Sequence, residues 1–124
     1  MLKVVKFGGS SLADAAQFRK VKEIVLADPA RRVVVVSAPG KRFDGDHKIT
    51  DLLYLCYAHI QYGVSAEGVF GMIAERYRSI AADCGLSTDI EAELAALYEK
   101  MQHGISQDEL VSRGEYFVAR LMAE

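Results

Sequence analysis

The first forty residues change from a strand-like to a helix-like hydrophobic pattern and back. A short apolar run from Leu2 to Phe7 holds two adjacent β-branched valines and predicts a strand. The next apolar positions recur at helical spacing, at Phe18, Val21, Ile24 and Val25. Four consecutive valines between Arg32 and Ser37 predict a second strand that is covered on both faces. Strand, helix and strand make a βαβ unit, which implies a parallel pair with a right-handed crossover.

Beyond residue 48 the hydrophobic positions keep a helical period to the end of the chain. Asp14 with Gln17 predicts a cap for the first helix, and the later helices would begin at Thr50, Ser65, Thr88 and Ser106. The last two of these starts are capping boxes, completed by Glu91 and Glu109. A polar loop from Pro39 to His47 separates the βαβ unit from the helices. Its length predicts a functional or mobile segment, and we expect it to be mobile without a ligand.

These elements indicate an α/β domain with a helix-rich C-terminal half. A length of 124 residues is typical of one domain. Two parallel strands are too few to form a stable central layer. The last helical pattern also reaches Glu124 without a Gly, Asn or Pro to end it. We therefore expect the sequence to be part of a longer protein.

Composition excludes several classes of protein. The formal net charge of −2 gives no broad attraction to nucleic acid, and no apolar run is long enough to span a membrane. Cys56 and Cys84 are far apart, and no Cys or His pair has zinc-ligand spacing. Free thiols in a reducing compartment are the simplest interpretation, although a disulfide stays open. With no signal-peptide pattern at the N-terminus, we expect a cytoplasmic protein.

The first candidate site follows the first strand, where Lys6 precedes Gly8, Gly9 and Ser10. Glycines without Cβ atoms let backbone N–H groups approach an anion, and a helix start beyond them adds positive potential. The motif matches neither the P-loop nor the dinucleotide fingerprint. Its lysine comes before the glycines, so its amine would reach a phosphoryl group from the strand end. An ordinary Gly-Gly turn beside a solvated lysine is the alternative.

Two further candidates come from the next segment. Ser37 and the Pro39-Gly40 turn directly follow the second strand, and parallel strands gather ligands at their carboxyl ends. Both glycine turns would then share one edge of the sheet and form the floor of a pocket. Thr50, at a predicted helix start, could hold a carboxylate or phosphate, or could be a plain cap.

The last candidate is Glu115, which follows Gly114 inside a helical pattern. A helical glycine costs about 1 kcal/mol relative to alanine, so close approach to a ligand or another backbone is a reasonable cause. Glu115 could receive an ammonium group, or it could be a surface residue beside a packing glycine.

Four segments together resemble the aspartokinases of the amino-acid kinase family. They are Lys6 to Ser11 (KFGGSS), Val34 to Gly40 (VVVSAPG), Lys48 to Leu53 (KITDLL) and Ser112 to Glu115 (SRGE). The resemblance implies a three-layer αβα sandwich with a mainly parallel sheet, of which residues 1–124 would be the N-terminal, substrate-side portion. The nucleotide half and the regulatory ACT domains would be absent.

The resemblance also implies an activity, in which the γ-phosphate of ATP moves to the side-chain carboxylate of L-aspartate and gives 4-phospho-L-aspartate. This is the first step toward lysine, threonine and methionine. Lys6, Gly8, Gly9 and Ser10 would hold the ATP phosphates, with Lys6 as the catalytic charge. Ser37 and Thr50 would contact aspartate near its reacting end, and Glu115 would hold its ammonium group. Mg²⁺ would be carried by the phosphates rather than by a protein site.

The sequence departs from the family pattern where a small hydroxyl residue is frequent three positions after the motif glutamate, since Val118 occupies that place. We expect this portion alone to be inactive and the full-length form to be a homo-oligomer. The alternative hypothesis is a stand-alone, non-catalytic binding or assembly module derived from such a kinase. Exposed strand edges would then favour self-association.

Overall fold

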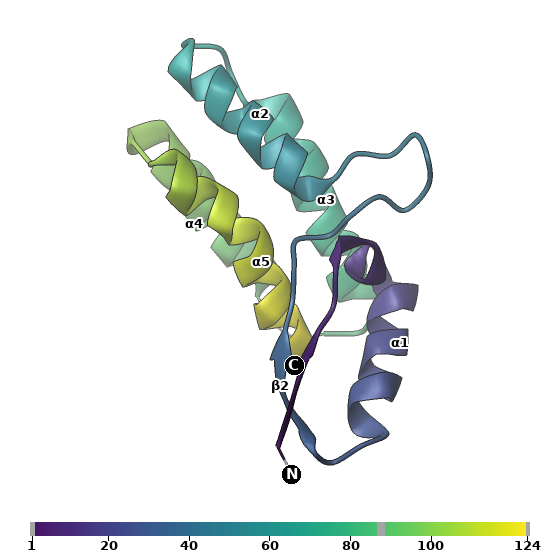
Figure 1. Ribbon diagram of the computed structural model, residues 1–124. Coiled ribbons are helices and arrows are strands. Elements are labelled where there is room, and N and C mark those ends of the chain that lie inside the picture. Colours follow the sequence, from purple (N-terminus) through teal and green to yellow (C-terminus); the bar gives the residue numbers. More distant parts are fainter. Residues whose placement is uncertain (1, 87–88, 124) are drawn as a thin grey trace.

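The computed structural model describes residues 2–86 and 89–123 and has two parts (Figure 1). The first is a βαβ unit, with strand β1 (Lys3–Lys6), a short 3₁₀ turn η1 (Gly9–Leu12), helix α1 (Ala15–Leu26) and strand β2 (Arg31–Val35). The second is helical, with α2 (Ile49–Gln61), α3 (Glu67–Asp83), α4 (Ile90–His103) and α5 (Gln107–Ala123). The predicted α/β class and the helix-rich second half are confirmed.

The two strands are parallel, as the βαβ pattern predicts, with Val4 opposite Val33 and Lys6 opposite Val35. Helix α1 begins where Asp14 Oδ1 accepts a hydrogen bond of 3.0 Å from the Gln17 amide, so the predicted cap is confirmed. At its other end the chain turns back, and Asp28 pairs with Lys3 at 2.7 Å. That ion pair ties the start of β1 to the α1–β2 connection.

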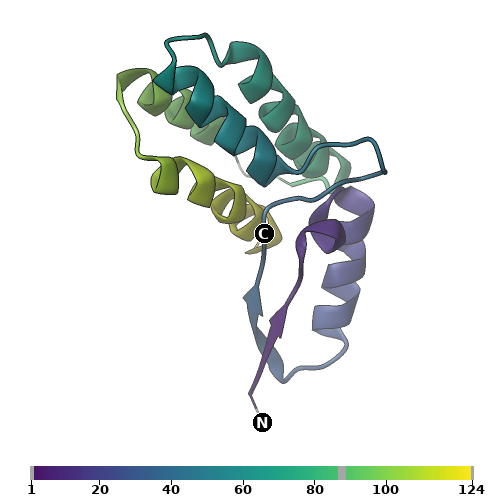
Figure 2. The ribbon, with the colours of Figure 1, turned by 45° about the horizontal axis from the view of Figure 1, so that its top comes forward.

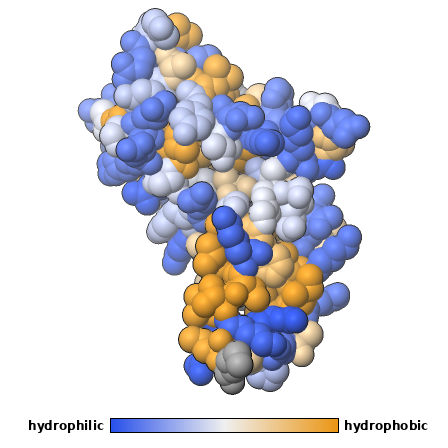
Figure 3. Space-filling model, viewed as in Figure 1, coloured by the Kyte–Doolittle hydropathy of each residue, from blue (hydrophilic) through white to orange (hydrophobic). Residues whose placement is uncertain are grey.

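The expectation that the second strand is covered on both faces is wrong for the described residues. Val33 and Val35 are each 43 % exposed, and Val4 beside them is 64 % exposed. Successive side chains of a strand point to opposite faces, so these valines share the face opposite to Val34. Figure 3 shows apolar side chains gathered over this part of the molecule. The physical reason is that the described elements cover only the other face of the sheet.

The helical starts agree with the sequence in part. Ser106 Oγ accepts a hydrogen bond of 3.2 Å from the Glu109 amide, as its capping box predicts. Thr50 is not a cap, because α2 starts one residue earlier and its N-cap is Lys48, which makes no side-chain cap bond. The predicted cap Thr88 lies outside the described residues, and the N-cap of α4 is Asp89, which accepts from the Ala92 amide at 3.1 Å.

The main core lies among the four helices and extends to α1 (Figure 2). Its centre is Tyr77 of α3, fully buried, with its ring 5.2 Å from that of Phe117 on α5 in an edge-to-face contact. Val118, which replaces the expected hydroxyl residue, is also fully buried in this core. None of the helices in the described ranges combines the length and apolar character needed to cross a membrane.

Candidate functional site

The two glycine turns meet at the carboxyl ends of the two strands. The Gly40 amide donates a hydrogen bond of 2.8 Å to the Gly9 carbonyl. A Cβ atom on Gly40 would lie 2.7 Å from the Gly9 carbonyl carbon and 2.8 Å from the Ser10 nitrogen. Such distances are below any normal contact, so this approach of one backbone to the other requires glycine at position 40. The predicted meeting of the turns at one edge is therefore found.

The base of the Pro39 to His47 loop is closed by a second backbone contact. The Ile49 amide, at the start of α2, donates a hydrogen bond of 3.0 Å to the Pro39 carbonyl. Ser37 lies two residues before this contact and Thr50 one residue after it, and both are half-buried. The structure thus brings the segments of these two candidates together, although they are thirteen positions apart in the sequence.

Helix α5 approaches the same region through Gly114. A Cβ atom there would lie 2.8 Å from Ala38 Cβ and 3.1 Å from Leu53 Cδ1. The close approach that a helical glycine suggests is present, and it is made to protein atoms. The Tyr77 hydroxyl donates a 2.8 Å hydrogen bond to the Gly114 carbonyl, which fixes α5 against α3. Glu115, the next residue, is exposed.

The remaining candidates lie at the end of β1. Lys6 is the last residue of the strand and is exposed. Since it pairs with Val35, its side chain lies on the open face of the sheet. Ser10 is exposed within η1, whereas a Cβ atom on Gly8 would meet nothing within 4 Å. Gly8 also has φ −80° and ψ 176°, a conformation open to any residue. Nothing in the chain's own packing requires glycine at this position.

A buried ion cluster beside the turns was not found from the sequence. Asp46 accepts hydrogen bonds from both Arg42 and Arg76, at 2.6 and 2.8 Å respectively, and only 8 % of it is exposed. Hydrogen bonds from Arg42 lower the pKa of the Asp46 carboxyl well below its usual range. The signal in the sequence was Arg76 itself, a charged residue three positions after Ile73 on the inward face of α3.

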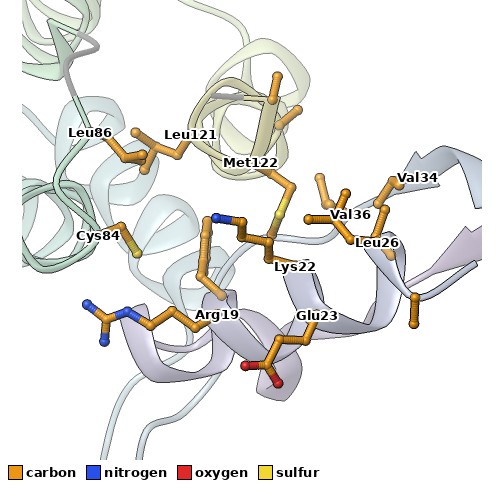
Figure 4. A pocket seen from close by; sticks show the side chains of 15 residues that line it. Arg19, Lys22, Glu23, Leu26, Val34, Val36, Cys84, Leu86, Leu121 and Met122 are labelled. Carbon is orange, nitrogen blue, oxygen red and sulfur yellow. The ribbon is translucent and has the colours of Figure 1, made fainter.

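Two hollows lie outside the predicted residues. A groove of about 980 Å³ runs between α1, β2 and the end of α5, with a mainly apolar lining to which Arg19, Lys22 and Glu23 also contribute (Figure 4). A smaller hollow of about 160 Å³ lies over the Asp46 cluster. Neither is lined by any of the seven candidate residues. Within the described ranges, no three His, Cys, Asp or Glu side chains group as metal ligands.

Comparisons with known proteins agree on one family. The family model described as "Amino acid kinase family" matches residues 1–124. Aspartokinase 3 of Bacillus subtilis is 51 % identical over 89 residues, which are 72 % of this chain and 20 % of that protein. The crystal structure of Clostridium acetobutylicum aspartate kinase matches 97 % of this chain and 28 % of its own, with 46 % identity and a TM-score of 0.94.

A second solved structure is more distant and carries ligands. Escherichia coli aspartokinase III in complex with aspartate and ADP matches the whole of this chain and 28 % of its own, with 28 % identity and a TM-score of 0.61. The chain therefore spans between a fifth and three tenths of the length of these relatives. The predicted amino-acid kinase fold is confirmed by these likenesses.

Proposed function

The chain belongs to the amino acid kinase family, and we propose that it is the N-terminal, substrate-side portion of an aspartate kinase. The full-length enzyme would transfer the γ-phosphate of ATP to the side-chain carboxylate of L-aspartate and form 4-phospho-L-aspartate. The Bacillus and Clostridium relatives support this proposal by their names, and the Escherichia coli structure supports it by its ligands, aspartate and ADP. The nucleotide half and the ACT domains would belong to the remainder of the protein.

The observation that carries the proposal is the contact between the two glycine turns, Gly40 N–H to Gly9 carbonyl at 2.8 Å. It puts both turns at the carboxyl ends of parallel strands, where ligands of such sheets bind. Phosphoryl transfer depends on positioning and charge stabilisation more than on covalent chemistry of the protein. Lys6 would stabilise the charge of the ATP phosphates, while Gly8, Gly9 and Ser10 would offer backbone and hydroxyl donors.

Gly8 gives this assignment a specific support. Its backbone conformation is open to any residue and the space around it is free, so packing does not require glycine at position 8. A ligand that approaches the backbone closely would explain why residue 8 is glycine. In our proposal the phosphates of ATP occupy that space, on the side of the sheet where Lys6 lies.

The aspartate side of the site would be formed by Ser37, Thr50 and Glu115. The closed loop base holds the segments of Ser37 and Thr50 together, and Thr50 lies in the first turn of α2, where the helix dipole favours an anion. Glu115 would pair with the substrate ammonium group. The attacking carboxylate is ionised at neutral pH, so the reaction needs no general base but must overcome repulsion between two anions.

In our proposal, Mg²⁺ binds together with the nucleotide. Mg²⁺ in such sites keeps several waters and is bound by substrate phosphates with one or two carboxylates, rather than by a cage of protein ligands. When bound, Mg²⁺ would supply positive charge to the transferring phosphoryl group. The chain's own part would be to orient the phosphates with Lys6 and the first glycine turn.

The test is a kinetic assay of the full-length protein that carries this sequence. ADP release should depend on L-aspartate, and glutamate should not replace it. Lys6→Ala should lower kcat by about 100-fold or more, because it removes a preorganised charge. Gly8→Ala should fold normally and bind ATP more weakly. No aspartate-dependent ADP release from the wild-type protein would refute the function, and a fully active Lys6→Ala variant would refute the role of that residue.

Glu115→Ala separates substrate binding from chemistry. The exposed side chain makes no hydrogen bond or ion pair that the structure shows within the described residues, so its removal should leave stability unchanged. If it holds the ammonium group, the KM for aspartate should rise while the KM for ATP stays constant. An unchanged KM for aspartate would count against this role.

The same proposal implies a metabolic role, a compartment and an oligomeric state for the full-length protein. The product would feed lysine, threonine and methionine synthesis, and we expect the enzyme to work in the cytoplasm as a homo-oligomer. Both cysteines are free thiols, consistent with a reducing compartment. The exposed valines of the sheet face favour one alternative, a stand-alone, non-catalytic binding or assembly module derived from such a kinase. A monodisperse monomer of the 124-residue chain in light scattering, well folded by amide exchange, would count against that alternative.

A further inference from the structure

Arg76 is the one buried cation that reaches several segments of the site at once among the described residues. It lies on α3, which carries none of the four family-like motifs, and only 3 % of it is exposed. Its Nη1 donates to the Gly40 carbonyl at 2.7 Å and to the Ala13 carbonyl at 3.4 Å. Its Nη2 donates to Asp46 Oδ2 at 2.8 Å and to the His47 carbonyl at 3.0 Å.

These four acceptors belong to the segments that build the candidate site. Gly40 is the residue whose backbone touches the first glycine turn, and Ala13 directly follows η1, which that turn begins. Asp46 and His47 end the loop that begins at the second turn. One guanidinium therefore joins the first turn, the second turn and the far end of the loop.

The loop is held from its own side as well. Asp46 Oδ2 accepts hydrogen bonds from the Arg42 amide and Arg42 Nε, and Asp46 Oδ1 accepts from Arg42 Nη2 at 3.0 Å. The Ile49 amide closes the base of the loop on Pro39. Anchors of this kind favour a loop with one conformation. Sequence reasoning predicts a mobile loop, and that prediction stays untested.

The chemistry of the side chain suits a geometric role. A guanidinium has five N–H donors in a rigid fork, whereas a lysine ammonium is a point charge on a flexible stem. A buried ion cluster contributes little net stability, because the loss of hydration offsets the attraction between the charges. The consequence of this cluster is then the relative position of the segments that it joins.

We propose that Arg76 is a positioning residue for phosphoryl transfer, which holds the second glycine turn and the rest of the Pro39 to His47 loop in register with the first turn. The inference rests on the proposed function and deepens it, since the hydrogen bonds of Arg76 go to the chain's own acceptors in the segments of the site. A misplacement of about 1 Å at such a site lowers the rate by up to about 100-fold. Loss of the guanidinium should therefore lower kcat more than it raises either KM.

The experiment compares Arg76→Met, Arg76→Lys and a control, Arg78→Met, in the full-length protein. Arg78 lies two positions further along α3 and forms an exposed ion pair with Glu91. Arg76→Met should lower kcat about 10- to 100-fold with nearly constant KM values. Arg76→Lys should recover part of that loss, and Arg78→Met should match the wild type.

Hydrogen exchange supplies the readout that a merely structural role would not produce. In Arg76→Met the hydrogen-bonded amides of Gly40, Arg42 and Asp46 should exchange at least about ten-fold faster, while those of α4 and the middle of α1 stay as in the wild type. Unchanged exchange and kcat in Arg76→Met would overturn the proposal. So would faster exchange in all elements together, since that pattern means global destabilisation.

The experiment also decides the proposal if Arg76→Met does not fold or if the wild-type protein is inactive. If Arg76→Met does not fold, Arg76→Lys alone tests the positioning role. A kcat and a hydrogen exchange equal to those of the wild type in Arg76→Lys would refute that role. If the wild-type protein does not phosphorylate aspartate, the proposed function fails. The exchange of the Gly40, Arg42 and Asp46 amides then still decides whether Arg76 fixes the loop and the turns.

Discussion

Replacement of Gly40 by alanine should destabilise the chain strongly, because its Cβ would collide with backbone. The added atom would lie 2.7 Å from the Gly9 carbonyl carbon, 2.8 Å from the Ser10 nitrogen and 3.0 Å from the Gly9 oxygen. Backbone atoms on a second turn cannot rotate away as a side chain can. The two turns must separate, and the 2.8 Å hydrogen bond between them weakens.

The magnitude follows from three contributions. Forced repacking of this kind costs about 1–3 kcal/mol. Loss of the hydrogen bond adds about 1 kcal/mol. Alanine also restricts the unfolded chain, which offsets about 0.4–1 kcal/mol of this loss. This gain applies because Gly40 does not have a positive φ and alanine can adopt its backbone conformation. The net loss is about 2 kcal/mol, a large part of the stability of a small domain.

The assay is equilibrium urea unfolding followed by far-UV circular dichroism, with Gly71→Ala as the matched control. Gly71 lies within α3, and a Cβ atom there would meet nothing within 4 Å. Alanine should stabilise that helix by about 0.5–1 kcal/mol. A Gly40→Ala chain that unfolds at the same urea concentration as Gly71→Ala would refute the close contact of the two turns.

Two further predictions concern buried polar groups. Tyr77→Phe removes the hydrogen bond to the Gly114 carbonyl and should lower the free energy of unfolding by about 1 kcal/mol, measured in the same urea assay; no change would mean that this contact does not fix α5. The pKa of Asp46 is lowered in the folded state, mainly by hydrogen bonds from Arg42, so the unfolded chain binds the proton more readily. Stability should therefore be constant near neutral pH and fall as the pH drops below about 4, less steeply in Asp46→Asn than in the wild type. Equal acid profiles for the two chains in urea titrations would contradict this assignment.

The elements predicted best are those set by local sequence. Asp14 caps α1 through the Gln17 amide, and Ser106 accepts from the Glu109 amide, as their spacing indicates. The prediction that Thr50 caps α2 was wrong, because the helix starts at Ile49 with Lys48 as its N-cap. Residues with a good capping side chain near a helix start are easily misplaced by one or two positions.

What depends on tertiary packing was predicted less well. The meeting of Gly9 and Gly40 followed from parallel topology, which sends both strand ends to one edge. The cluster of Arg76 and Asp46 joins residues thirty positions apart, and no local pattern encodes that pairing. The valine run of β2 predicted burial on both faces. Val33 and Val35 stay half-exposed, because burial depends on elements that the run itself does not specify.

We infer that the two glycine turns and the start of α2 form one site for phosphate and aspartate. The most direct test is an NMR titration of the full-length protein with aspartate and ADP, with the backbone amides of residues 6–10, 37, 38, 40 and 49–51 assigned. We predict that these amides shift together and saturate when both ligands are added. Shifts confined to the groove between α1 and α5, with the turn amides unmoved at saturating ligand, would contradict it.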